Sequence, residues 1–179
     1  MKATGIVRRI DDLGRIVIPK EIRRVLHIKD SDPIEIFAGR EGEIILRKYS
    51  PIGELDRFAR DLVDCFYDET GKTVCILDRE AFVAATGAMK QTLEGKNISA
   101  ELASCIEGRK AVLFKKSEKG IPLTEKGNHV LKEGVVVPII CQGDCLGGVL
   151  VIWENVAEEE KLVTSAKIIA TFVARQLEL

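Results

Sequence analysis

The alternation of apolar and polar positions changes character near residue 50 of this chain. Before that point, short apolar stretches are separated by turn residues, a pattern typical of β-strands. Pro19 suits the first position of a helix, and the residues from Lys20 to His27 place apolar and basic side chains on opposite sides. The pattern predicts one short helix there, a turn at 11–14, and strands over residues 5–10, 15–18, 33–38 and 43–47.

Beyond residue 53, apolar residues also recur at the spacing of an α-helix over long stretches. Two helices are predicted, over residues 54–67 and 157–177, each with one continuous apolar stripe. The longest apolar runs cover residues 135–141 and 145–153. They predict two strands, over residues 134–141 and 145–153, that form a hairpin around Gln142-Gly-Asp144. An antiparallel sheet flanked by helices at its start and end defines an α+β domain. The remaining predicted strands cover 73–77, 81–85 and 112–114, and the remaining helices 90–93 and 99–107.

The segment Tyr49-Ser-Pro-Ile-Gly53 interrupts both patterns and marks a domain boundary. We expect a first domain over residues 1–50, a linker over 51–55 and a second domain over 56–179. Domains below roughly 40–60 residues usually need a disulfide, a bound metal or a partner chain to be stable. The first domain contains no cysteine and one histidine, so neither a disulfide nor a zinc site is expected in it. The sequence therefore predicts that this domain forms a symmetric dimer.

Charge is distributed unevenly between the two domains. Residues 1–50 contain 11 Lys and Arg against 8 Asp and Glu, whereas residues 51–179 contain 16 against 20. The excess of positive charge in residues 1–50 of an otherwise acidic chain indicates that this domain binds a polyanionic partner. The alternative interpretation of the same charges is a solvated basic surface.

Composition and motifs argue against several classes of protein. The apolar runs fall short of the ~20 residues of a membrane helix, and no secretion signal is visible. Five cysteines without an export signal favour free thiols in the cytoplasm. Cys141 and Cys145 form the sharpest pair, but a zinc site needs two more ligands, so buried thiols are favoured. No nucleophile, metal or dinucleotide motif is present, and we expect neither an enzyme nor a cofactor.

The segment Thr4-Gly-Ile-Val-Arg-Arg-Ile-Asp-Asp-Leu-Gly-Arg-Ile-Val-Ile-Pro-Lys-Glu-Ile-Arg-Arg-Val-Leu-His-Ile closely resembles the DNA-binding domain of AbrB-type transition-state regulators of spore-forming bacteria. The resemblance covers residues 1–50. It implies a swapped-hairpin dimer, in which strands of two chains interleave into a β-barrel-like domain. It also implies that arginines around the first loop and the helix contact DNA, here Arg8, Arg15, Arg23 and Arg24. Arg9 is a weaker match, and Lys2 and Lys20 are added on charge alone.

Guanidinium groups suit DNA because they bind phosphates bidentately and can read guanine edges in the major groove. Four arginines per chain give eight per dimer. If all eight met phosphates, the slope of log affinity against log salt would reach about −7.

The order of elements in residues 56–179 resembles that of GAF domains. This resemblance implies self-association through the first and last helices. Packing of those helices on their own sheet is the other interpretation, and one protein can combine both. Two self-associating domains in one chain predict a homotetramer. No ligand signature is present, so a small-molecule effector of this domain is left open. The predicted oligomerisation residues are Leu55, Phe58, Leu62, Phe66, Leu162, Ala166, Ile169, Val173 and Leu177.

These features predict a sequence-preferring, DNA-binding transcription regulator. The resemblance implies an activator and repressor of sporulation-stage genes that acts in the cytoplasm, on the nucleoid and in the forespore. One alternative is an antitoxin, because some antitoxins share the swapped-hairpin fold and wrap a toxin with a disordered acidic tail; residues 54–179 instead have the composition of a folded domain. Another alternative is an enzyme or ligand carrier that uses the GAF-like pocket, for which no polar constellation is visible.

Overall fold

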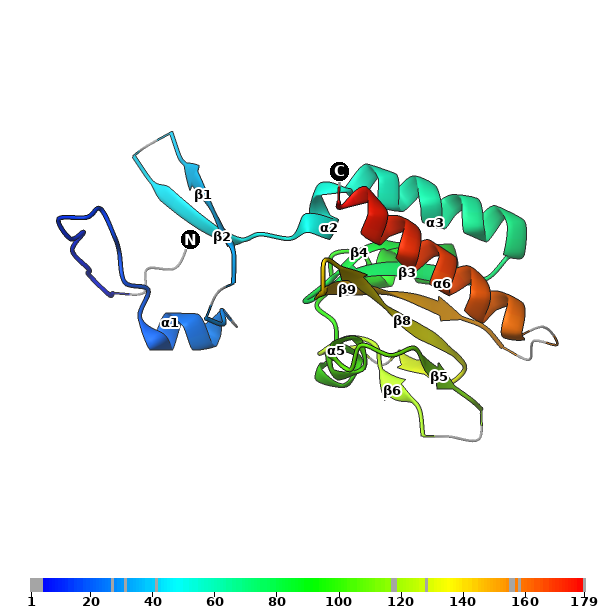
Figure 1. The fold of residues 1–179 in the computed structure, drawn as a ribbon. Helices are drawn as coiled ribbons and strands as arrows, with labels where there is room; N and C mark the ends of the chain where they lie inside the picture. Colours follow the sequence, from blue (N-terminus) through cyan, green and yellow to red (C-terminus); the bar gives the residue numbers. More distant parts are fainter. Residues whose placement is uncertain are drawn as a thin grey trace. The chain divides into compact units, whose positions relative to one another are not determined.

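The structure is a computed structural model that describes residues 5–26, 28–30, 32–40, 42–116, 119–127, 129–154, 157 and 159–178. It forms two compact units, the first ending at Tyr49 and the second beginning at Ser50 (Figure 1). Among the described residues, no helix combines the length and the apolar character needed to cross a membrane.

The first unit contains one short helix and one β-hairpin. Helix α1 covers Lys20–Val25 and follows Pro19. Strands β1, Ile34–Ala38, and β2, Ile44–Lys48, pair in antiparallel register with Ile36 opposite Leu46. The helix and the two C-terminal strands of this unit therefore match the sequence prediction, with ends shifted by one or two residues.

Residues 5–18 are not strands in the single chain, contrary to our prediction for 5–10 and 15–18. A strand is defined by its ladder of hydrogen bonds, and this segment finds no ladder partner in the described part of the chain. Only the predicted turn is closed: Gly14 N donates to Asp11 O and Asp11 N donates to Arg15 O, both at 3.0 Å. The apolar side chains of the segment are left in solvent, with Val7 84% and Val17 72% exposed.

The second unit is built on a five-stranded antiparallel sheet with strand order β4-β3-β9-β8-β5. The long hairpin of β8 and β9 lies at its centre, as predicted. A two-stranded ribbon, β6–β7, was not predicted. The strands are β3 Thr73–Asp78, β4 Phe82–Ala85, β5 Val112–Phe114, β6 Ile121–Pro122, β7 Val130–Leu131, β8 Gly134–Cys141 and β9 Asp144–Ile152.

Helices cover both faces of this sheet. The long helices α3, Asp56–Thr70, and α6, Glu159–Gln176, pack on one face, and α5, Ala100–Glu107, lies on the other (Figure 1). A short 3-10 turn, Gly87–Met89, leads into α4, Lys90–Leu93. Each face has its own buried cluster of apolar side chains, so the α+β class with an antiparallel sheet and flanking helices is confirmed.

Residues 51–55 are not a free linker, in contrast to our expectation. Pro51–Glu54 form helix α2, which Ser50 caps by accepting a hydrogen bond from Gly53 N at 3.0 Å. The Ser50 hydroxyl also donates to Asp78 Oδ2 at the end of β3, at 2.8 Å. Ile52 is fully buried in the cluster under α3 and α6. The second unit therefore begins at Ser50, because this turn contributes a side chain to its core.

Candidate nucleic-acid interface

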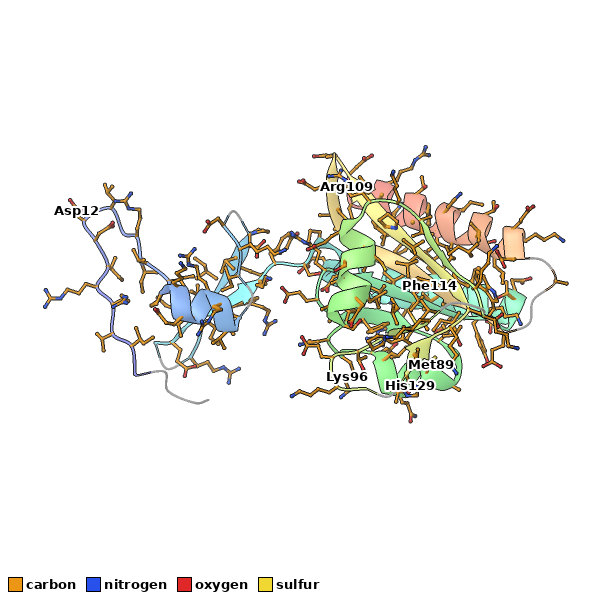
Figure 2. The ribbon with its side chains drawn as sticks, turned by 90° about the horizontal axis from the view of Figure 1, so that it is seen from below. Asp12, Met89, Lys96, Arg109, Phe114 and His129 are labelled. Atoms are coloured by element: carbon orange, nitrogen blue, oxygen red, sulfur yellow. The ribbon has the colours of Figure 1, made fainter. Side chains whose placement is uncertain are left out.

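The predicted DNA-contact residues in the described part of the chain all belong to the loop 5–19 and helix α1. The loop projects from its unit with Asp12 at its tip (Figure 2). Arg23 is half-buried, and Lys2 lies outside the described residues. The exposed members of the set are Arg8, Arg9, Arg15, Lys20 and Arg24.

Asp11 organises the loop and orients Arg15. Its Oδ1 accepts hydrogen bonds from the backbone N–H groups of Leu13, at 3.0 Å, and Arg15, at 2.7 Å. Its Oδ2 pairs with Arg15 Nε at 2.8 Å. Gly14 takes a φ of 76°, which a side chain would disfavour. The backbone and guanidinium N–H groups of Arg15, which favour the carboxylate form, hold the pKa of Asp11 below its usual value.

We expect Asp11→Asn to raise the affinity of the protein for duplex DNA by about two- to fivefold at low salt. Asparagine keeps an acceptor for the loop N–H groups but removes one negative charge from the predicted DNA-contact surface. Asp11→Ala also removes the acceptor, so it is expected to lower affinity by loosening the loop. Fluorescence anisotropy with one labelled duplex compares the three proteins, and equal affinities for both variants would contradict this role of Asp11.

Arg23 is held against the unit, whereas Arg24 is exposed. Arg23 Nη1 lies 2.6 Å from Asp30 Oδ1, and the Arg23 side chain is 37% exposed. Its Nε is buried and has no hydrogen-bond partner among the described groups. Both arginines lie in the last turn of α1, where positive charge is favoured by the helix dipole. The helix thus carries one guanidinium that an ion pair holds in place and one that is exposed.

The predicted oligomerisation residues pack mainly within their own domain. Leu162, Ala166, Ile169 and Val173 are buried under α6, so these four side chains cannot form an outer contact surface. The others, Leu55, Phe58, Leu62, Phe66 and Leu177, are half-buried against the same cluster. The apolar stripe of these helices therefore packs on the sheet of its own domain.

The sequence analysis missed the apolar residues on the outer side of α6. Ile168 is 64% and Phe172 is 44% exposed, and the Phe172 ring lies 5.5 Å from that of Phe58 on α3. They line a shallow depression together with Lys167, Thr171 and Arg175. The signal was present in the sequence, since α6 carries apolar residues outside its continuous stripe.

The cysteines show no common site. Cys141 is buried in the cluster under α6, whereas Cys145 packs against the cluster on the α5 side of the sheet. The Cys145 thiol donates to Ile106 O at 3.3 Å. Cys75 is fully buried, and this desolvation raises its pKa strongly. Among the described residues, no three His, Cys, Asp or Glu side chains are grouped as metal ligands would be.

The chain thus joins a small first unit with a basic loop and helix to a larger α+β unit. The family model "Stage V sporulation protein T C-terminal, transcription factor" matches residues 54–178, and "Antidote-toxin recognition MazE, bacterial antitoxin" matches residues 7–54. The chain is 44% identical over 178 residues to stage V sporulation protein T of Bacillus subtilis, covering 99% of both chains. The chain belongs to this family of sporulation transcription factors.

The first unit has a second group of relatives. The transition state regulatory protein AbrB of Bacillus subtilis is 57% identical over 51 residues, which are 28% of this chain and 52% of that protein. The predicted resemblance to AbrB-type regulators is therefore confirmed for the first unit.

The second unit has structural neighbours at low sequence identity, which concern the fold alone. A methyl-accepting chemotaxis protein fragment has a TM-score of 0.56 at 18% identity and covers 69% of this chain and 88% of its own. A free methionine-R-sulfoxide reductase from Thermoplasma acidophilum has a TM-score of 0.53 at 16% identity, with coverages of 69% and 94%. The GAF domain of the nutrient sensor CodY from Clostridium difficile has a TM-score of 0.49 at 16% identity and covers 65% of this chain and 81% of its own.

Proposed function

We propose that this chain is a sequence-preferring DNA-binding regulator that contacts DNA through Arg8, Arg15, Arg23 and Arg24 of a dimeric first unit. The observation that carries the proposal is the composition of the loop 5–19 surface. The loop exposes both arginines and large apolar side chains to solvent. The arginines supply charge-assisted contacts to phosphates and donors to base edges. Arg9 and Lys20 add positive charge to the same surface.

Dimerisation explains why the loop has strand-like sequence but no strand partner. In addition to Val7 and Val17, the unit exposes Ile36 and Ile44 by 69% and 68% on its hairpin. A monomeric unit of this size would leave most of its apolar side chains in water, which is unfavourable by about 25 cal/mol per Å². A second copy that pairs with residues 5–10 and 15–18 covers these side chains and completes the ladders, as in the swapped-hairpin fold.

We propose further that the second units associate through the outer side of α6, which makes the particle a tetramer. The exposure of Ile168 and Phe172 supports this proposal. Large apolar side chains that lie exposed beside each other on a helix are typical of a surface that binds another protein chain. A tetramer carries two DNA-binding dimers. Once one dimer has bound DNA, the other is held near the same DNA, and this raised effective concentration strengthens its binding.

Ile168→Asp is expected to convert the tetramer to a dimer while leaving the fold intact. The side chain is largely exposed, so the substitution costs little within one chain but places a charge in the apolar contact. Light scattering at micromolar concentration measures the mass. Arg57→Asp, on the exposed side of α3, is the matched control and should keep the tetramer. A dimeric wild-type protein would contradict the proposed association.

The regulatory role follows from the family and from the two-unit layout. We propose activation and repression of sporulation-stage genes in the cytoplasm, on the nucleoid and in the forespore, with the state of the second unit setting the spacing of the DNA-binding units. An effector of the second unit would raise its melting temperature on binding. The antitoxin alternative is not favoured, because the residues that would form a toxin-wrapping tail fold into the second unit.

Equilibrium titration of the full-length protein with duplex DNA tests this proposal. Tight binding that weakens steeply with salt is expected, with preference for some duplex sequences over others. Absence of DNA binding at low salt would overturn it and would move the antitoxin alternative to first place.

A further inference from the structure

The second unit separates its charges strongly along the chain. Residues 109–132 contain seven Lys and Arg against two Asp and Glu. The rest of residues 51–179 contains nine Lys and Arg against 18 Asp and Glu. Although the unit as a whole is acidic, residues 109–132 are basic, and we call them the basic segment.

The basic segment lies on the side of the sheet opposite to α3 and α6. It starts after α5, passes through the edge strand β5 and includes the β6–β7 ribbon (Figure 1). Figure 2 looks onto this side, with α5 in front, Arg109 at one end of that helix, and Lys96 and His129 at the other. The acidic helix α3 lies on the far side of the sheet in the same unit, together with α6.

Strand register brings three lysines of the segment together. Phe114 at the end of β5 pairs with Gly134, and Ile121 in β6 pairs with Leu131. Lys115 follows Phe114 and Lys119 precedes Ile121, so both approach the stretch between β7 and β8 that carries Lys132. All three are exposed, and Glu133 beside them is half-buried.

Two cations on the α3 side of the unit lie beside carboxylates. On the α3 side, Arg60 pairs with Asp56 and Glu94, and Lys90 lies 3.6 Å from Asp64. Within the described part of the chain, by contrast, no ion pair involves Lys115, Lys119 or Lys132. Exposed like charges that lie close together repel one another, and a polyanion relieves this repulsion.

We propose that the basic segment is a second DNA-contact surface, which binds the phosphate backbone beside the sequence held by the arginines of the first unit. This inference rests on the proposed function. Lysines are point charges that suit phosphates rather than base edges, so the contact adds affinity without sequence preference. DNA is favoured over other polyanions because the family is one of transcription factors.

The test uses the full-length protein with a short duplex and a duplex of the same central sequence with extended flanks. The variant is the triple substitution Lys115→Gln, Lys119→Gln and Lys132→Gln. On the long duplex, we expect the slope of log affinity against log salt to become shallower by about 2 to 3 and affinity to fall about tenfold. Binding to the short duplex should not change. Replacing the same three lysines by arginine should preserve both bindings.

The control has the same change in charge outside the basic segment: Arg57→Gln, Lys72→Gln and Lys161→Gln. Equal effects of the two triple variants, or no effect of the first on the long duplex, would overturn the inference and leave the proposed function standing. A changed particle mass with an unchanged salt slope would also overturn it, since the segment would then contact an acidic face of a second copy. A wild-type protein that binds neither duplex would overturn the proposed function and this inference together.

Discussion

Replacing Arg23 and Arg24 by alanine in the full-length protein is expected to lower its affinity for duplex DNA by roughly 100-fold or more. Each lost guanidinium contact is worth about 1–3 kcal/mol, and a dimer loses four of them. The loss of Arg23 also leaves Asp30 without its partner, so that an uncompensated negative charge lies beside the proposed DNA-contact surface. Competition titrations at fixed salt measure the change.

The matched control for this variant removes two positive charges from the second unit, with Arg57→Ala and Lys72→Ala. It keeps the same net charge as the Arg23 and Arg24 variant but leaves the surface of α1 intact. We expect wild-type affinity within about twofold, because neither residue belongs to the proposed arginine surface or to the basic segment. Equal losses in both proteins would show that net charge, rather than the arginine surface, governs binding.

The substitution Val17→Asp is expected to remove dimerisation of the first unit and DNA binding together. Val17 is 72% exposed in the single chain, so the new charge costs little there. In an interleaved dimer the same position becomes part of the core, where an unpaired carboxylate is strongly unfavourable. Sedimentation should show half the wild-type mass, and the DNA affinity should fall at least about 100-fold.

Arg40→Asp serves as the control for this variant because it makes a larger change in charge at an exposed turn of the same unit. It should keep the wild-type mass. The double variant Val17→Asp with Ile168→Asp should be a monomer, since the two proposed interfaces are independent. Wild-type mass and DNA binding of Val17→Asp would exclude residues 15–18 from the dimer core.

Sequence periodicity predicted the second unit well because its regular elements contact their own sheet. The stripes of α3 and α6 and the β8–β9 hairpin follow directly from apolar spacing. Helix α2 was missed because Ile52, its one buried residue, stands between Pro51 and Gly53, where no period can be recognised. The two-residue strands β6 and β7 are likewise too short for a periodic signal.

The candidate site was predictable in composition but not in geometry. The resemblance to AbrB-type domains pointed to the arginines, because the motif around Gly14 and Pro19 that carries it is contiguous in the sequence. The roles of Asp11 and Asp30 depend on how the loop and helix fold, and charge counting gives no sign of them. Residues 5–18 have a strand pattern without strand structure, because the pattern reports apolar positions that one chain alone does not bury.

The most direct test of DNA binding through this arginine surface is the salt dependence of affinity for the full-length protein and four single variants. Arg8→Ala, Arg15→Ala, Arg23→Ala and Arg24→Ala each remove two contacts per dimer. The account predicts a wild-type slope of up to about −7 in log affinity against log salt, which each variant makes shallower by up to roughly 2. A shallow wild-type slope, or four variants with the wild-type slope and affinity, would contradict it.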